Sequence, residues 1–254
     1  MYDERRGLRA NVAVFAALAL VSTVLVMAPV SDALGSSSID TLTDPAEKGL
    51  AIARERKARD AGWGDMKADM VMTLRNAAGK TNSRKIRSQA LEMADDGDLT
   101  LAIFDHPLDI KGTSFLTHSH ILEPDEQWLY LPALKRVKRI NAKTRSGPFM
   151  GSEFAYEDMS SFEVEKYDFE FLRDERLGDV ECYVSQSQPR DPHSGYSRMV
   201  SWVDKQDFKV LKVDYYDRRG ELLKTLKASD YSLYKDRFWR ASTVRMVNHQ
   251  TGKS

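Results

Sequence analysis

The fold of this chain follows from one alternating stretch, Met66-Lys67-Ala68-Asp69-Met70-Val71-Met72-Thr73-Leu74-Arg75. Apolar side chains occupy every second position, and the positions between them are mostly charged or hydroxylated. A period of two is typical of a β-strand with one apolar face and one wet face. The stretch therefore predicts a sheet that begins near Asp65.

Further strands are predicted downstream of this stretch, with short turns between them. The first two turns, Asn76-Ala77-Ala78-Gly79 and Asp95-Asp96-Gly97-Asp98, indicate a meander. The other predicted strands cover residues 84–93, 99–104, 114–122, 127–140, 167–172, 181–187, 198–204, 210–216, 221–227, 231–233 and 238–247. So many consecutive short strands predict a mainly β fold with one strongly curved antiparallel sheet, closed or nearly closed, because a flat sheet of that width would expose its edges.

One helix is predicted ahead of the sheet. Asp44 is placed as its N-cap, Pro45 takes the first helical position, and Glu47 can close a capping box. We expect the helix to end near Asp60 and to lie on a larger surface, because its apolar face is thin. That face consists mainly of Ala46, Leu50 and Ala53.

The N-terminal region has the pattern of an export signal. Residues 10–30 contain no charge, and Arg5, Arg6 and Arg9 precede them. The small residues around Ala33 fit cleavage after that position. An uncleaved anchor is the alternative, because about 20 apolar residues span a bilayer core.

This pattern sets the expected organisation of the chain. We expect a signal peptide over residues 1–33, a flexible lead-in over 34–43 and a single β domain over 44–254, located in the periplasm. No cysteine directly follows the apolar run, so we do not expect a lipoprotein. Cys182 is the only cysteine, which excludes an internal disulfide and indicates a buried, inert thiol.

Charge and motifs narrow the function classes. The chain has 38 basic and 38 acidic residues, and this balance gives no argument for a nucleic-acid partner. It contains no Gly-x-Ser-x-Gly elbow, glycine-rich phosphate loop or His-Glu-x-x-His sequence. Nothing therefore indicates an enzyme, catalytic residues or a cofactor.

Two polar patterns are candidate binding sites. His118 and His120 would share one face of a strand and could begin a metal site, but no third ligand is fixed nearby by the sequence, so we predict none. The basic stretch around residues 135–139 could dock on anionic headgroups or an acidic partner, or it is simply solvated. Its docking candidates are Arg136, Lys138 and Arg139.

Apolar residues supply the remaining candidates. Some alternate along predicted strands, and others lie in the long stretch 143–163. That stretch lacks a strand period, which suits either a mobile apolar flap or a plug that closes one end of the barrel. Such stripes line a cavity or fill an ordinary core, and the sequence leaves both open. The candidate ligand-binding residues are Met66, Met70, Met72, Phe115, Trp128, Tyr130, Phe149, Met150, Phe154, Phe169 and Phe171.

Several motifs, taken in order, resemble the LolA-like outer-membrane lipoprotein-sorting family, in particular the branch associated with lipid exporters of the RND or MMPL type. The resemblance covers the chain from about Asp44 onward. Its motifs are Asp60-Ala61-Gly62-Trp63, Gln127-Trp128-Leu129-Tyr130-Leu131-Pro132, Arg136-Val137-Lys138-Arg139-Ile140, Phe149-Met150-Gly151-Ser152-Glu153-Phe154, Tyr156-Glu157-Asp158, Trp202-Val203-Asp204, Val213-Asp214-Tyr215-Tyr216-Asp217, and Trp239 leading to Thr251-Gly252.

The resemblance implies a half-open β-barrel around a short helical lid, with an apolar cavity for acyl chains and no catalytic residues. It implies a periplasmic carrier that takes a lipid or lipoprotein from an inner-membrane exporter toward the outer membrane, with transient membrane contact. An envelope sensor or regulatory adaptor of the same fold is the alternative. One departure is that the chain stops at Ser254, where the family continues into a further strand, so either the chain is truncated or its last strand lacks a neighbour.

Overall fold

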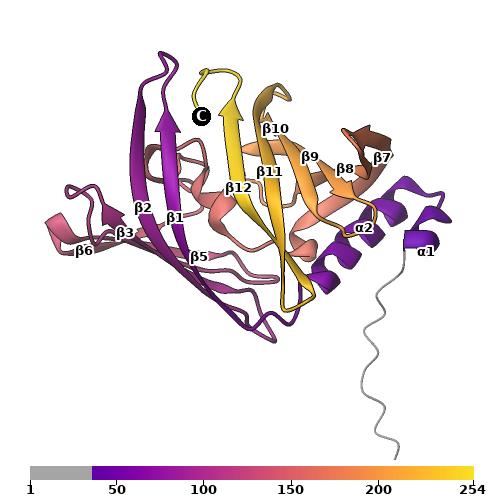
Figure 1. Ribbon diagram of the computed structural model, residues 1–254, viewed down its shortest axis with the longest axis horizontal. Helices are drawn as coiled ribbons and strands as arrows, with labels where there is room; N and C mark the ends of the chain where they lie inside the picture. The colour runs from indigo at the N-terminus through magenta and orange to yellow at the C-terminus, as the bar shows by residue number, and fades with distance from the viewer. Residues whose placement is uncertain (1–35) are drawn as a thin grey trace, which may run out of the picture. The chain divides into compact units, whose positions relative to one another are not determined.

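The computed structural model describes residues 36–254, which form two six-stranded antiparallel sheets (Figure 1). The expected signal peptide and its cleavage after Ala33 lie outside the described residues. The first sheet contains β1 (Asp65–Arg75), β2 (Thr81–Leu91), β3 (Leu99–His106), β4 (Ser114–His118), β5 (Glu126–Leu131) and β6 (Arg136–Ile140). The second contains β7 (Tyr167–Leu177), β8 (Val180–Pro189), β9 (Tyr196–Asp204), β10 (Val210–Asp217), β11 (Leu222–Tyr234) and β12 (Phe238–Asn248).

Strand order follows chain order in both sheets, as a meander requires. The first hairpin shows why: the Asn76 side chain accepts a hydrogen bond from Lys80 N at 2.9 Å, and Gly79 takes a φ of 83° that favours glycine. The mainly β, half-open fold is confirmed. The single curved sheet is corrected to two, which do not join into a closed barrel.

The prediction divides or joins strands wrongly at two places, and several strand ends also differ, as in β4 and β7. A 3₁₀ turn, η1 (Pro132–Leu134), divides the predicted strand 127–140 into β5 and β6. The segments expected as two strands at 221–227 and 231–233 form one strand, β11. Asp230 takes a φ of 55° within it, yet the ladder to β12 continues from Ser229 opposite Thr243 to Tyr231 opposite Ala241.

Helix α2 (Pro45–Arg59) begins as predicted, because Asp44 Oδ1 accepts a hydrogen bond from Glu47 N at 2.8 Å. Its buried face was predicted only in part: Ala53 is buried and Leu50 half-buried, but Ala46 is exposed, while Gly49 and Ile52 are buried. Gly49 explains the difference: a Cβ there would lie 2.7 Å from the backbone nitrogen of Glu170 in β7. A glycine therefore allows the helix to lie directly on the strand.

The predicted lead-in is corrected in part. Residues Ser36–Asp40 form a short helix, α1. Ile39 is fully buried and packs in one cluster with Ile52 of α2 and Tyr183 of β8. Burial of this one large apolar side chain fixes a segment whose Ser- and Gly-rich composition suggested nothing to bury. In the described residues 36–254, no helix is long and apolar enough to cross a membrane.

The segment between the sheets, residues 141–166, is called the plug segment below. It contains three 3₁₀ turns, η2 (Phe149–Gly151), η3 (Tyr156–Met159) and η4 (Val164–Lys166). Phe149 is 2% exposed in the core of the first sheet, and Phe154 packs against the cores of both sheets. Of the two interpretations left open, plug and mobile flap, the packing favours the plug.

Cys182 is buried as predicted, and burial raises the pKa of its thiol to about 11. Because the thiolate is the reactive form, we expect no reaction with a thiol-specific disulfide reagent at pH 8 in the folded protein. One equivalent should react after unfolding in guanidinium chloride. Rapid labelling without denaturant would contradict this burial.

Candidate functional site

The methionine stripe of β1 faces the same side as the core but is left partly uncovered. Residues opposite each other in an antiparallel pair share a face, and Met70 lies opposite Ile86, which is 3% exposed in the core. Met72 packs against that core, whereas Met66 and Met70 remain 37% and 42% exposed. This face is therefore an apolar wall that the described side chains do not fill.

A cleft lies between α2 and the second sheet. It is narrow: its cavity volume is about 20 Å³, roughly the room that one water molecule needs, and it opens to solvent. Its lining combines apolar and hydroxyl side chains with one cation: Ile52, Ala53, Arg56, Phe162, Phe169, Ser185, Ser187, Ser201 and Val203. The predicted residue Phe169 thus lies in the cleft, while Phe171 packs against the neighbouring core beneath the Lys48 ammonium, 4.3 Å from the ring centroid.

Arg56 is the cation of this cleft, and sequence reasoning missed it. Its guanidinium lies 4.0 Å from the ring centroid of Phe162. The Arg56 side chain makes no ion pair or hydrogen bond with the described residues 36–254. Burial lowers its pKa, and the nearby carboxylate of Asp60 opposes this shift. One feature of the sequence could have identified Arg56: it lies one helical turn after Ile52, on the same face of α2 as Gly49. A half-buried cation without a paired carboxylate is suited to an anionic group.

Two predicted cavity residues lie elsewhere. Leu129 is 6% exposed in the core, and Phe115 lies opposite it in the neighbouring strand. Because side chains alternate along a strand, Trp128, next to Leu129 in the chain, points to the other face of the first sheet. Tyr130 shares that outer face and is 38% exposed. Their assignment to the cavity is corrected, because a period of two separates the two faces without indicating which one is inside.

The remaining aromatic candidates form one packed cluster. Phe115 is 3% exposed, and its ring centroid lies 5.0 Å from that of Phe149. Met150 and Phe154 pack against the same cluster. These residues fill the space between the plug segment and the first sheet, so they form core and not an open lining.

A buried ion pair holds the plug segment to the second sheet. Lys224 Nζ lies 2.7 Å from Asp158 Oδ2, and their side chains are 4% and 7% exposed. The Tyr196 hydroxyl donates to the other Asp158 oxygen at 2.8 Å, and Lys224 also donates to the Glu153 carbonyl at 2.9 Å. Burial, followed by the nearby Asp158 charge, raises the pKa of Tyr196, so its hydroxyl stays a donor.

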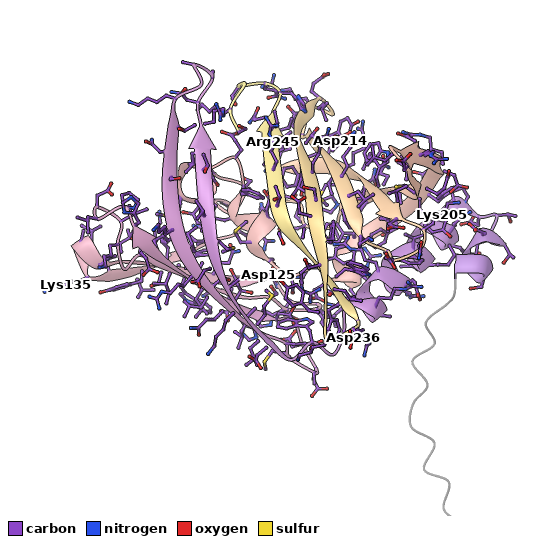
Figure 2. The ribbon with its side chains drawn as sticks, viewed as in Figure 1. Asp125, Lys135, Lys205, Asp214, Asp236 and Arg245 are labelled. Carbon is purple, nitrogen blue, oxygen red and sulfur yellow. The ribbon has the colours of Figure 1, made fainter. Side chains whose placement is uncertain are left out.

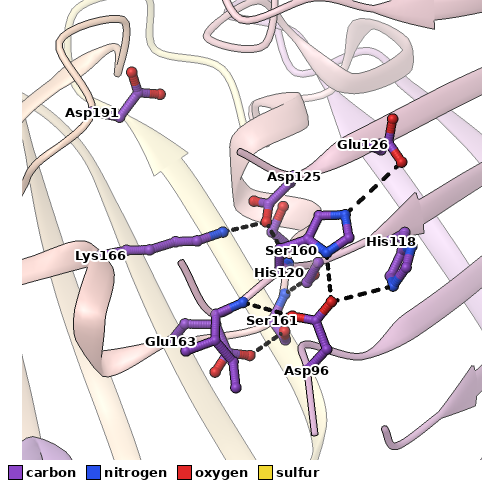
Figure 3. A network of polar contacts seen from close by, with 12 residues as sticks. Asp96, His118, His120, Asp125, Glu126, Ser160, Ser161, Glu163, Lys166 and Asp191 are labelled. Atoms are coloured by element: carbon purple, nitrogen blue, oxygen red, sulfur yellow. Dashed lines mark hydrogen bonds and ion pairs between the residues drawn. The ribbon is translucent and has the colours of Figure 1, made fainter. Parts of the chain in front are cut away.

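A second anchor joins the plug segment to the first sheet and to α2, and Figure 3 shows its Ser161 and Glu163. Ser161 N donates to Ser119 Oγ at 2.9 Å, and Ser161 Oγ donates to Glu163 Oε1 at 2.6 Å. Glu163 is 1% exposed and pairs with Lys57 of α2 at 2.9 Å. The plug segment is therefore held by contacts to both sheets and to α2.

The predicted docking residues divide into paired and unpaired side chains. Arg139 pairs with Glu126 at 2.5 Å. Arg136 and Lys138 are exposed on β6, the edge strand of the first sheet, and make no ion pair within residues 36–254. Figure 2 shows Lys135 at the tip of the β5–β6 hairpin, so this part of the edge is rich in positive charge.

The two sheets meet along unpaired edges. Strands β1 and β12 are edge strands, each with one ladder neighbour. At one end Arg75 and Ser254 exchange two backbone hydrogen bonds of 2.7 and 3.0 Å, and at the other Lys235 Nζ donates to the Trp63 carbonyl at 2.9 Å.

Comparisons with known proteins agree with this geometry. A family model described as an uncharacterized protein matches residues 96–254. The structure is similar to an outer membrane lipoprotein-sorting protein domain from Vibrio parahaemolyticus, with 57% identity, a TM-score of 0.81, and coverage of 82% of this chain and 88% of that one. No curated protein matches the sequence.

Two further solved structures share the fold. A DUF1329 family protein from Desulfovibrio piger is 28% identical with a TM-score of 0.78, over 83% of this chain and 89% of that one. A LolA superfamily protein from Nitrosomonas europaea is 17% identical with a TM-score of 0.63, again over 83% of this chain and 89% of that one. The second likeness concerns the fold alone.

Proposed function

Because the chain belongs to the LolA-like family of outer-membrane lipoprotein-sorting proteins, we propose that it is a carrier for a lipid or for the acyl chains of a lipoprotein. The observation that supports this proposal is the uncovered apolar wall of β1. Met66 and Met70 face the interior side of the first sheet and yet stay more than a third exposed. Methionine side chains adapt to ligands of varied shape, which suits a carrier of flexible chains.

Binding by such a wall needs no directional contact. Each square ångström of apolar surface removed from water contributes roughly 25 cal/mol. A long acyl chain can therefore be held by area alone and released when a receptor offers a drier surface. Strands β1 and β12 share no ladder, so along this seam the two sheets are joined by end contacts such as the backbone hydrogen bonds of Arg75 with Ser254.

Arg56 indicates which head group the proposed ligand has. Its unpaired guanidinium stands among the hydroxyl groups of Ser185, Ser187 and Ser201, beside the apolar ring of Phe162. A carboxylate or phosphate there would gain a charge-assisted hydrogen bond that a neutral head would not. The cleft thus favours an amphiphile with an anionic head.

The cellular route is also part of the proposal. The chain would work in the periplasm after removal of residues 1–33, receive its cargo from an inner-membrane exporter of the RND or MMPL type, and pass it toward the outer membrane. The exposed, unpaired Arg136 and Lys138 are the residues that we propose for contact with the exporter or with anionic headgroups. The family resemblance and the edge position of β6 support this assignment.

The proposal predicts that Met70→Glu weakens binding of a fluorescent long-chain fatty acid at least about tenfold, because it places a charge on the apolar wall. Val71→Glu is the matched control. Its side chain lies on the opposite face and is 68% exposed, so binding should not change. Fluorescence titration of both variants, with native mass spectrometry of the protein purified from cells expressing the full chain, provides the measurement. Equal affinities, or repeated isolation without any hydrophobic ligand, would count against the carrier function.

A further inference from the structure

Three side chains with metal-ligand chemistry meet beside the plug segment. They are Asp96, His118 and His120, whose potential ligand atoms all lie within 4.8 Å of one another. His120 Nδ1 is 2.6 Å from Asp96 Oδ2, and His118 Nε2 is 3.8 Å from the same oxygen (Figure 3). The sequence indicated the two histidines as possible metal ligands, but it indicated Asp96 only as part of a turn.

The sheet topology explains how Asp96 becomes the third ligand. β3 pairs with β4 so that Leu99 lies opposite His118. The turn just before β3 therefore meets the loop just after β4. Gly97 permits the close approach, since a Cβ there would lie 2.5 Å from the backbone carbonyl of Ser119.

The hydrogen bonding around the potential ligand atoms leaves two of them available to an ion. His118 Nε2 is buried and has no hydrogen-bond partner in the described chain. Asp96 Oδ1 accepts from Ile121 N at 2.9 Å, which fixes the carboxylate and leaves Oδ2 directed at both imidazoles.

The spacing matches a small divalent ion. Bonds of about 2.0–2.2 Å place the ligand atoms of a tetrahedral zinc roughly 3.3 Å apart. The two measured separations, 2.6 and 3.8 Å, bracket that value, and small side-chain rotations would equalise them. Two imidazoles favour zinc or a similar transition metal over calcium or magnesium, which prefer ligand sets made of oxygen.

Further residues around the cluster have the arrangement of an outer shell. Glu126 Oε2 lies 3.9 Å from His120 Nε2, the nitrogen that faces away from Asp96. A carboxylate on the far nitrogen orients a metal-bound imidazole and raises its basicity. The side chains of Asp96 and His118 are 38% and 28% exposed, which leaves room for a solvent molecule as a fourth ligand.

We propose that Asp96, His118 and His120 form a binding site for zinc or a similar divalent transition metal, with solvent as the fourth ligand. Ser119, between the two histidines, is the residue that receives the hydrogen bond from Ser161 of the plug segment. A bound ion would fix the loop that carries Ser119 and so stabilise the plug anchor. This inference concerns a site separate from the acyl wall of β1 and does not depend on the carrier function.

Zinc titration of the chelator-treated protein, in competition with a chromophoric chelator, tests the site. We expect one tight equivalent, a rise in melting temperature with zinc, and at least about tenfold weaker binding in His118→Ala and Asp96→Asn. His193→Ala is the control, because this exposed histidine lies in another loop and should leave zinc affinity unchanged. Absence of zinc binding, or equal affinity in all four proteins, would overturn the site.

Both substitutions are chosen so that the variants are expected to fold. His118→Ala removes no hydrogen bond made by Nε2, and Asp96→Asn keeps an oxygen for Ile121 N. Circular dichroism checks that both variants are folded. If either is not, the visible spectrum of the cobalt-loaded wild type decides: four-coordinate bands with nitrogen ligands support the site, and a hexa-aqua spectrum overturns it.

Discussion

The Asp158→Ala variant is expected to lose about 3–5 kcal/mol of unfolding free energy, because it leaves a buried cation without its partner. Lys224 is 4% exposed, and after the substitution only the Glu153 carbonyl accepts from its ammonium. The Tyr196 hydroxyl loses its acceptor as well. Urea denaturation followed by intrinsic fluorescence gives the measurement.

Two companion variants separate the buried charge from ordinary surface electrostatics. Glu181→Ala breaks the pair with Arg176 in the same sheet, where both side chains are 60% exposed, and should cost less than about 1 kcal/mol. The double variant Asp158→Ala/Lys224→Met should be more stable than Asp158→Ala alone, because it removes the unpaired cation. A loss in Asp158→Ala no larger than in Glu181→Ala would show that the plug segment is not held by this pair.

Phe149→Ala is expected to cost about 3–5 kcal/mol, as for other fully buried phenylalanines. The ring is 2% exposed and contacts Phe104, Phe115 and Tyr156, with centroid separations of 6.0, 5.0 and 5.6 Å. Its removal leaves a cavity between the plug segment and the first sheet, which a rigid sheet cannot close. The same denaturation experiment measures the loss.

Leu108→Ala is the control for this substitution. Leu108 is 82% exposed, so its change should stay within about 0.5 kcal/mol. A similarly small effect of Phe149→Ala would mean that the plug segment opens in solution, as the flap interpretation requires. A large effect with unchanged fatty-acid binding would show that the plug supports the fold while the wall of β1 binds the ligand.

The sequence by itself determined the features that depend on near neighbours in the chain. The Asp44 cap, the helix that follows it, the Gly79 turn and the period of two in β1 each result from local backbone and hydrogen-bond preferences. Because successive strands pair in order, the meander also follows from short turns. These features were predicted almost at their observed residues.

Tertiary structure decided which side of each strand is covered. Alternation placed Trp128 and Leu129 on opposite faces, but only the packing of Phe149 onto the first sheet made the face of Leu129 the inner one. The same holds for Asp96, which lies more than twenty residues before His118 and reaches it through the register of β3 and β4. Local preferences act over a few residues, whereas face and site depend on contacts between segments distant in the chain.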